Sequence, residues 1–128
     1  MSLKIAARTR LTGHNASIFA ITQGEEPHIF YSGAGDGWVV RWDLNDPELG
    51  RLVAEASEQV FALAYLPQTH CIVAGTMNGQ INWIDLNDAE KTKRLEFHKN
   101  GVYDLQLDGD QLFSLAGDGT LSLWDVQT

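Results

Sequence analysis

The sequence has one cysteine and no long apolar run, and each shortage excludes a class of protein. Cys71 has no second cysteine in the chain with which to form a disulfide, and no cysteine and histidine spacing matches a zinc site. Residues 1–10 lack the apolar run of a signal peptide, and no apolar stretch reaches the roughly 18 residues of a membrane span. We therefore expect a soluble, cytoplasmic protein with no metal and no membrane partner.

Positive charge is also scarce. The 128 residues include 9 basic and 17 acidic side chains, which gives a net charge of −8 at pH 7. A surface of this sign repels the phosphates of nucleic acids and the headgroups of anionic lipids, so we expect neither as a partner. It would attract a basic surface on another protein or peptide.

What the sequence does contain is a segment that occurs three times, over residues 32–43, 74–85 and 114–125. Each copy has Asp-Gly or Asn-Gly near its middle, and the starts are 42 and then 40 residues apart. The flanking residues 18–20 return at 60–62 and at 102–104, so the repeats stay in register beyond the segment. Periods of this size are typical of repeat proteins.

Within each repeat, β-branched and aromatic runs bounded by turn residues predict strands. Asp-Gly in the first and third copies is a strong hairpin signal, because glycine tolerates the positive φ of such turns. Residues 60–65 form a nearly continuous apolar run, which indicates a strand buried on both faces. The predicted strands are residues 4–11, 17–22, 28–33, 38–43, 51–55, 59–65, 71–76, 80–85, 93–96, 101–107, 111–115 and 120–125.

Three signals occur in a fixed order: Gly-His at His14, Asp-Gly at Asp36, and Trp-Asp at Trp42. At a spacing near 40 residues they make the chain similar to the WD-repeat β-propellers over essentially its whole length. The resemblance implies an all-β fold of three four-stranded antiparallel blades. The expected division is a strand at 1–11 that completes a last blade, blade 1 at 12–55, blade 2 at 56–97, and blade 3 at 98–128, which lacks its outer strand.

The resemblance also implies a buried hydrogen-bonded tetrad of His, Ser, Asp and Trp in each regular blade. These types suit the task, since the indole only donates, the carboxylate only accepts, and the hydroxyl does both. The second unit has Ala56, Ala74, Asn78 and Ile84 in the four positions, so it is expected to fold as a degenerate blade. The predicted tetrads are His14, Ser32, Asp36 and Trp42 in the first unit, and His98, Ser114, Asp118 and Trp124 in the third.

Catalytic and metal-binding interpretations are weaker. The histidine–aspartate pairs belong to the repeated tetrads and are therefore expected to be structural. His70 and Cys71 are neighbours on a strand and so point to opposite faces, which argues against a catalytic dyad and for a buried core thiol. Residues 108–110 lack the full ligand set of a calcium loop. Glu25 and Glu26 are expected to be solvated loop tips. We predict no enzyme activity and no cofactor.

The aromatic residues five positions after the His position of each unit are the best candidates for function. In the family that the sequence resembles, this position lies near the entrance of the central channel, where partner peptides dock. An alternative is that the rings simply pack between blades. The candidate partner-binding residues are Phe19, Phe61 and Tyr103, with Ser17, Gln59 and Met77 beside them.

These patterns predict a non-enzymatic interaction scaffold that binds a protein or peptide. A small-molecule-binding or hydrolytic propeller is an alternative that rests on fold analogy alone, and a structural half of a larger assembly is another. Propellers close with about four to eight blades, so three need more. We expect a segment of a longer propeller, with a homodimer that completes a six-bladed ring as the alternative.

Overall fold

The computed structural model describes residues 3–48 and 50–126. The regular secondary structure of these residues consists of strands and one short 3-10 helix, η1 (Ala89–Lys91). The strands are β1 (Ile18–Gln23), β2 (Ile29–Ala34), β3 (Trp38–Asp43), β4 (Arg51–Glu55), β5 (Val60–Leu66), β6 (Cys71–Thr76), β7 (Gln80–Asp85), β8 (Lys93–Glu96), β9 (Val102–Asp108), β10 (Gln111–Ala116) and β11 (Leu121–Asp125).

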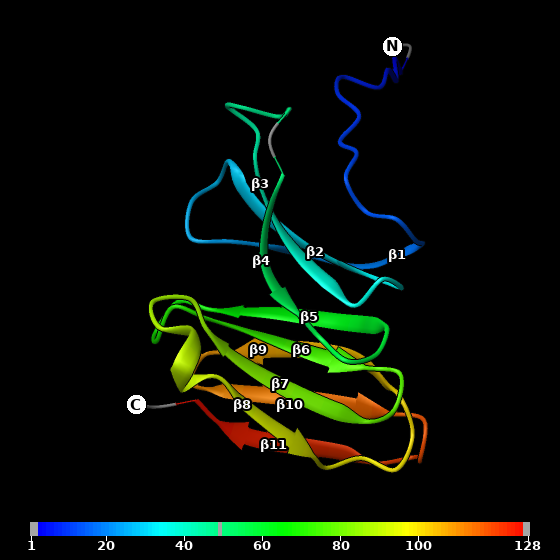
Figure 1. The fold of residues 1–128 in the computed structure, drawn as a ribbon, viewed down its shortest axis with the longest axis vertical. Helices are drawn as coiled ribbons and strands as arrows, with labels where there is room; N and C mark the ends of the chain where they lie inside the picture. Colours follow the sequence, from blue (N-terminus) through cyan, green and yellow to red (C-terminus); the bar gives the residue numbers. More distant parts are fainter. Residues whose placement is uncertain (1–2, 49, 127–128) are drawn as a thin grey trace.

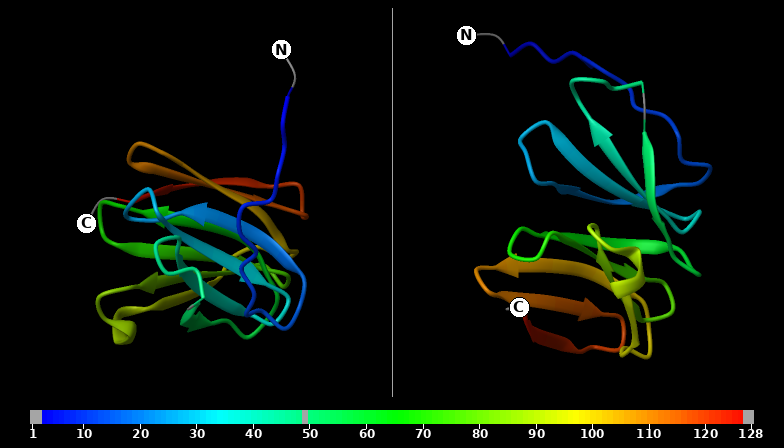
Figure 2. Two further views of the ribbon diagram at one scale, coloured as in Figure 1. Left: turned by 90° about the horizontal axis from the view of Figure 1, so that it is seen from above. Right: turned by 60° about the vertical axis from the view of Figure 1, so that its left-hand side comes forward.

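The strands form three antiparallel sheets, one for each repeat, which we call blades 1 to 3. Blade 1 has the order β1-β2-β3-β4, blade 2 the order β5-β6-β7-β8, and blade 3 the three strands β9-β10-β11. Figure 1 shows blade 1 above the other two, and the second panel of Figure 2 shows the three sheets fanning out in sequence order. The predicted all-β architecture of propeller blades is confirmed.

Tight turns join the second and third strands of every blade. Each turn has a glycine with positive φ, at Gly37 (+80°), Gly79 (+88°) and Gly119 (+83°). Aspartate side chains support two of these turns, because Asp36 accepts from the Trp38 N–H at 2.9 Å and Asp118 accepts from the Thr120 N–H at 3.0 Å. The Asp-Gly signals therefore mark the hairpins as predicted.

Neighbouring blades bury their facing sheets against each other. Ile29, Tyr31 and Val39 of blade 1 pack with Leu63 and Ile72 of blade 2. The opposite face of blade 2 packs on blade 3 through a second core that includes Ala64, Val73, Ile81, Val102, Leu105 and Leu112. All six residues of β6 are buried, because this central strand of the middle blade has a neighbour on both sides.

The strand predicted at residues 4–11 does not form. This segment has no strand assignment and is exposed along nearly its whole length. It runs beside and beyond blade 1, whereas the free edge of blade 3 is β11, at the other end of the stack (Figure 2). A strand must pair with the edge of a sheet, and this segment pairs with none of the described strands.

Glu25 is a second correction, because it is not a solvated loop tip. Its carboxylate accepts from the Tyr31 hydroxyl at 2.9 Å and from the Arg41 guanidinium at 3.2 Å. Burial and the Glu25 carboxylate together raise the pKa of Tyr31. The Tyr31 ring stacks on Tyr65 of blade 2 with centroids 6.0 Å apart. The Glu25 side chain thus fixes a ring that lies between blades.

Cys71 is a free, buried cysteine, as predicted. Burial raises the pKa of its thiol, so the neutral form is favoured. His70 bonds elsewhere, since its Nδ1 lies 2.8 Å from the Tyr65 hydroxyl. The two residues form no dyad.

Candidate functional site

In blade 1, the structure brings the four tetrad side chains together in one chain of hydrogen bonds. The Trp42 indole N–H donates to Ser32 Oγ at 2.8 Å, and Ser32 Oγ lies 2.6 Å from His14 Nε2. His14 Nδ1 lies 3.0 Å from an Asp36 carboxylate oxygen. Since the indole can only donate, the Ser32 hydroxyl donates its own proton to Nε2, and Nδ1–H donates to Asp36.

The tetrad joins four separate parts of blade 1. His14 precedes β1, Ser32 is on β2, and Trp42 is on β3, while Asp36 sits in the turn between β2 and β3. Burial alone would raise the pKa of Asp36, but backbone N–H groups and His14 bond to the carboxylate and hold its pKa below the usual value. The tetrad is therefore a tie between secondary-structure elements.

In blade 3, the hydrogen-bond chain contains a fifth residue, Thr120, which was not predicted from the sequence. The Trp124 indole N–H donates to Ser114 Oγ at 2.9 Å, and Ser114 Oγ lies 3.0 Å from His98 Nε2. On the other side of the ring, His98 Nδ1 is 3.0 Å from Thr120 Oγ1 but 3.5 Å from the Asp118 carboxylate. The Thr120 hydroxyl donates to Asp118 and links the two.

Blade 2 has no such chain. The residues in its tetrad positions include Ala56, Ala74 and Ile84, which carry no polar side-chain atom. Asn78 accepts a hydrogen bond from the Thr76 hydroxyl within its own turn. The blade nevertheless forms all four strands, with β6 fully buried, and none of its four tetrad positions holds a polar side chain without a partner.

A Ser–His–Asp arrangement invites comparison with a hydrolase triad. Ser32 has the required neighbours, but its Oγ already accepts the Trp42 N–H, and the residue is only 4% exposed. No substrate carbonyl can approach a hydroxyl in this position. The geometry therefore favours a structural role for the tetrad.

The predicted aromatic residues lie in a row at one end of the blades. The rings of Phe19 and Phe61 meet edge to face with centroids 5.0 Å apart, and Phe61 stacks with Tyr103 at 5.8 Å. Phe19 is 48% exposed and Tyr103 is 61% exposed. We call these three rings the aromatic row. The rings touch one another across the blades and also remain open to solvent, so the two alternatives from the sequence are not exclusive.

The other three candidates lie directly beside the aromatic row. The carbonyl of Ser17 accepts from Gly35 N–H at 2.8 Å, and the carbonyl of Gln59 accepts from Met77 N–H at 2.9 Å. Blade 3 has the same bond, from Gly117 N–H to the carbonyl of Gly101. Each hydrogen bond connects the segment before the first strand of a blade to the turn after its second strand. It thereby holds the aromatic residue at this end of the blade.

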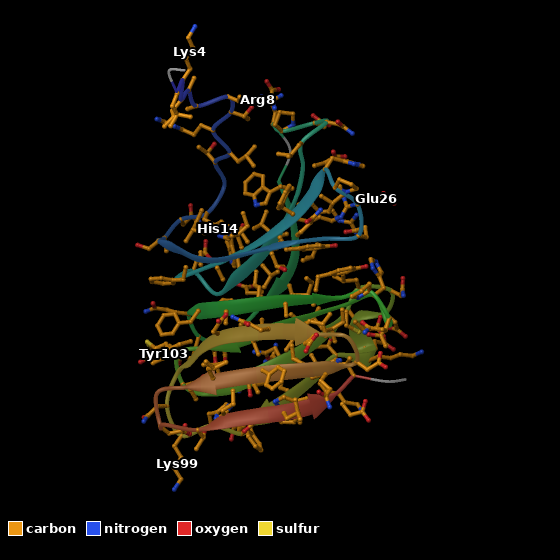
Figure 3. All side chains as sticks on the ribbon, turned by 180° about the vertical axis from the view of Figure 1, so that it is seen from behind. Lys4, Arg8, His14, Glu26, Lys99 and Tyr103 are labelled. Atoms are coloured by element: carbon orange, nitrogen blue, oxygen red, sulfur yellow. The ribbon has the colours of Figure 1, made fainter. Side chains whose placement is uncertain are left out.

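The aromatic row and the loop tips occupy opposite ends of the strands. Figure 3 shows Tyr103 at one edge of the sheets and Glu26 at the other. The three rings of the aromatic row, together with the Met77 side chain, which is 42% exposed, form a continuous apolar surface across the three blades. Polar groups surround this surface. A surface of this kind suits a partner chain better than a small substrate.

The described ranges 3–48 and 50–126 contain neither a metal-binding cluster nor a membrane-spanning helix. No group of three or more His, Cys, Asp or Glu side chains there is placed to hold a metal ion. Over the same residues, no helix is long and apolar enough to span a membrane.

Comparison with known proteins agrees with this geometry. Residues 89–125 match the family model described as "WD domain, G-beta repeat". The whole chain is similar to guanine nucleotide-binding protein subunit beta-1 of Drosophila melanogaster, with 29% identity over 133 residues. Both comparisons support the resemblance to WD-repeat proteins that the repeats predict. The segment that matches the family model runs from η1 to the end of β11 and includes the whole of blade 3.

Solved WD-repeat structures share the fold. The WD40 β-propeller domain of Doa1 superposes with a TM-score of 0.79 and 22% identity over 90% of this chain, and the RRP9 WD40 repeats with a TM-score of 0.75 and 18% identity over 91%. This chain spans 39% of the length of the Drosophila protein, 39% of the Doa1 chain and 37% of the RRP9 chain. The relatives are thus more than twice as long.

Proposed function

We propose that this chain is a non-enzymatic interaction scaffold that binds a protein or peptide at the rim formed by the aromatic row. The observation that carries the proposal is the row itself. Equivalent positions of three successive blades place Phe19, Phe61 and Tyr103 in contact, yet leave the outer two rings about half exposed or more. Large exposed rings held rigidly are typical anchors of protein interfaces.

The partner is proposed to be basic. The chain has a net charge of −8, and carboxylates lie near the aromatic row in the sequence, at Asp104 next to Tyr103 and at Glu58, three residues before Phe61. An arginine or lysine side chain could stack its alkyl part on a ring and place its charge near these carboxylates. Such a partner should bind more weakly as salt concentration rises.

The absence of catalysis and a cytoplasmic location are part of the same proposal. WD-repeat proteins are generally non-catalytic scaffolds, and the Ser32 hydroxyl of the triad-like arrangement is occupied and buried. The lone, buried thiol of Cys71 is compatible with a reducing compartment.

Capture of partners by matched variants tests the proposal. The wild-type chain, the double variant Phe19→Ala/Phe61→Ala and a control variant Leu52→Ala are immobilised, and proteins retained from a lysate are compared. Leu52 is an exposed apolar residue on β4, away from the aromatic row. We expect the double variant to lose binding proteins that the control retains, while all three chains melt at similar temperatures. Loss of folding in the double variant, with no separate binding defect, would show that the rings only pack between blades.

A second role, in assembly, is favoured by the two end faces of the stack. Blade 1 has an apolar hollow of about 260 Å³ beside Trp42, with Leu11, Ile21 and Leu44 in its lining. On blade 3, Leu121 and Leu123 are exposed. Apolar faces of this kind are normally covered by further blades.

The further blades would come from more of the same polypeptide or from a second copy that completes a six-bladed ring. Light scattering on the chain over a range of concentrations separates these sources. A stable species of twice 14.2 kDa supports the homodimer, and a monomer at all concentrations excludes it.

A further inference from the structure

A cavity between blades 1 and 2 is lined by Ala56 and Ile84, which hold two of the four tetrad positions of blade 2. Its volume is about 540 Å³, which lies in the range of small-molecule sites. One wall is the outer strand of blade 1 and the residue after it, with Val53, Glu55 and Ala56, and the other is blade 2, with Asn82, Ile84 and Arg94. We call it the blade 2 cavity.

The repeat register explains why this space is empty. At the offset of 42 residues, Ala56 corresponds to His14 and Ile84 corresponds to Trp42. In blade 1, the Trp42 indole fills the space so tightly that a Cβ on Gly50 would come within 2.8 Å of the ring. The residue that corresponds to Gly50 is Thr92, which lines the blade 2 cavity. The positions that hold two large rings in blade 1 thus hold small or aliphatic side chains in blade 2, where they line the cavity.

Asn82 is the feature that distinguishes this cavity from a packing defect. It lies on β7 between Ala74 and Arg94 of the neighbouring strands, and it is only 2% exposed. Neither its amide nitrogen nor its amide oxygen has a hydrogen-bond partner among the described residues. The equivalent residue in blade 1 is the apolar Val40. A buried amide without partners is costly and rare, so it calls for a partner from outside.

We propose that the blade 2 cavity is a binding site for a neutral carboxamide group backed by an apolar body. A carboxamide has a donor and an acceptor side by side, as the Asn82 amide does, so two antiparallel hydrogen bonds can form. The apolar body would contact Ala56 and Ile84. The carboxamide could belong to a free small molecule or to an asparagine or glutamine side chain of a partner.

Arg94 is the movable part of the site. Its side chain is exposed, and its guanidinium reaches across to the carbonyl of Glu55 at 3.5 Å. Both residues line the cavity. This single long bond is weak, so the side chain can swing away and let a ligand reach Asn82. The site is separate from the aromatic row, and its occupation does not depend on a partner at the rim.

Titration of the chain with benzamide, followed by NMR of the side-chain amides, tests the proposal. Acetophenone is the matched control probe, because it has the same size and the acceptor but no donor. The exposed Asn78 provides an internal reference signal. We expect benzamide to shift the Asn82 NH₂ signals saturably, leave Asn78 unchanged, and bind about tenfold more tightly than acetophenone, as the loss of one or two hydrogen bonds implies.

The variant Asn82→Val copies the residue of blade 1. It should lose about tenfold in benzamide affinity and melt at the same or a higher temperature, because an unpaired buried amide is removed. A lower melting temperature with unchanged benzamide affinity would overturn the proposal, since it would show that Asn82 is satisfied within the fold. Equal affinity for both probes, or no saturable shift with benzamide, would overturn it as well.

A second arm identifies the source of the ligand. The capped peptide acetyl-Gly-Gln-Gly-amide is titrated beside the same peptide with Glu in place of Gln. Binding of the Gln peptide alone supports a partner side chain, and binding of benzamide without the Gln peptide supports a free small molecule. Equal binding of the Gln and Glu peptides would contradict recognition of a neutral carboxamide.

Discussion

Removal of the serine hydroxyl from a complete tetrad is the sharpest test of the structural account. Ser32→Ala leaves the Trp42 N–H without its acceptor and His14 Nε2 without its donor, and Ser32 and Trp42 are both buried. Each hydrogen bond contributes about 1 kcal/mol net, and an orphaned buried group costs about 1–3 kcal/mol. We expect a loss of about 2–3 kcal/mol in the free energy of unfolding, or about 8–12 °C in melting temperature.

The assay is thermal unfolding followed by circular dichroism, with Ser114→Ala as the equivalent change in blade 3. Ser122→Ala is the matched control, because Ser122 lies opposite Ser114 on β11 but outside the tetrad. The control should stay within about 0.5 kcal/mol of the wild type. Ala74→Ser in blade 2 should not stabilise the chain, since it adds one member of a tetrad that has no others. Melting like the wild type for both Ser32→Ala and Ser114→Ala would refute the reasoning.

Two further predictions concern charge and backbone. A hydrogen bond from the Thr120 hydroxyl is the main cause that holds the pKa of Asp118 at about 2, below its usual value of 3.8. Its stabilising effect is therefore complete above pH 3.8 and lost as pH falls toward 2, so melting over this range should depend less on pH in Asp118→Asn. Gly79→Ala should lower the melting temperature several degrees more than Gly109→Ala: both glycines have positive φ, but a Cβ on Gly79 would meet the His98 backbone, whereas one on Gly109 meets nothing within 4 Å. Equal melting of the two glycine variants would contradict this packing.

The sequence was sufficient to predict most of the strands because the repeat supplies three versions of one pattern. β3, β4, β6, β7 and β8 begin and end where predicted, β10 and β11 differ by one residue at one end, and β1, β2, β5 and β9 are shifted by one residue at both ends. A strand that is weak in one repeat is supported by its equivalents in the others. The strand predicted at residues 4–11 does not form. A strand must pair with the edge of a sheet, and a local sequence pattern does not reveal whether it will do so.

Contacts between individual side chains were harder to predict. Thr120 follows Asp-Gly, so its position near the tetrad could be expected from the sequence. The distance between the His98 ring and the Asp118 carboxylate, which lets the Thr120 hydroxyl bridge them, depends on packing and could not. Glu25 sits in an acidic loop, and only the fold reveals that it faces Tyr31. The blade 2 cavity was also hidden: the missing tetrad was clear from Ala56 and Ile84, but the unpartnered Asn82 amide was not.

Site-specific photo-crosslinking from the aromatic row tests the central claim most directly. Tyr103 is replaced by p-benzoylphenylalanine in one chain and Leu52 in another, and both are irradiated in a lysate. The scaffold account predicts adducts with another protein from position 103, absent from position 52 and reduced by added salt, because the proposed partner is basic. No adduct from position 103, adducts only with a second copy of the chain, or the same adducts from both positions would contradict it.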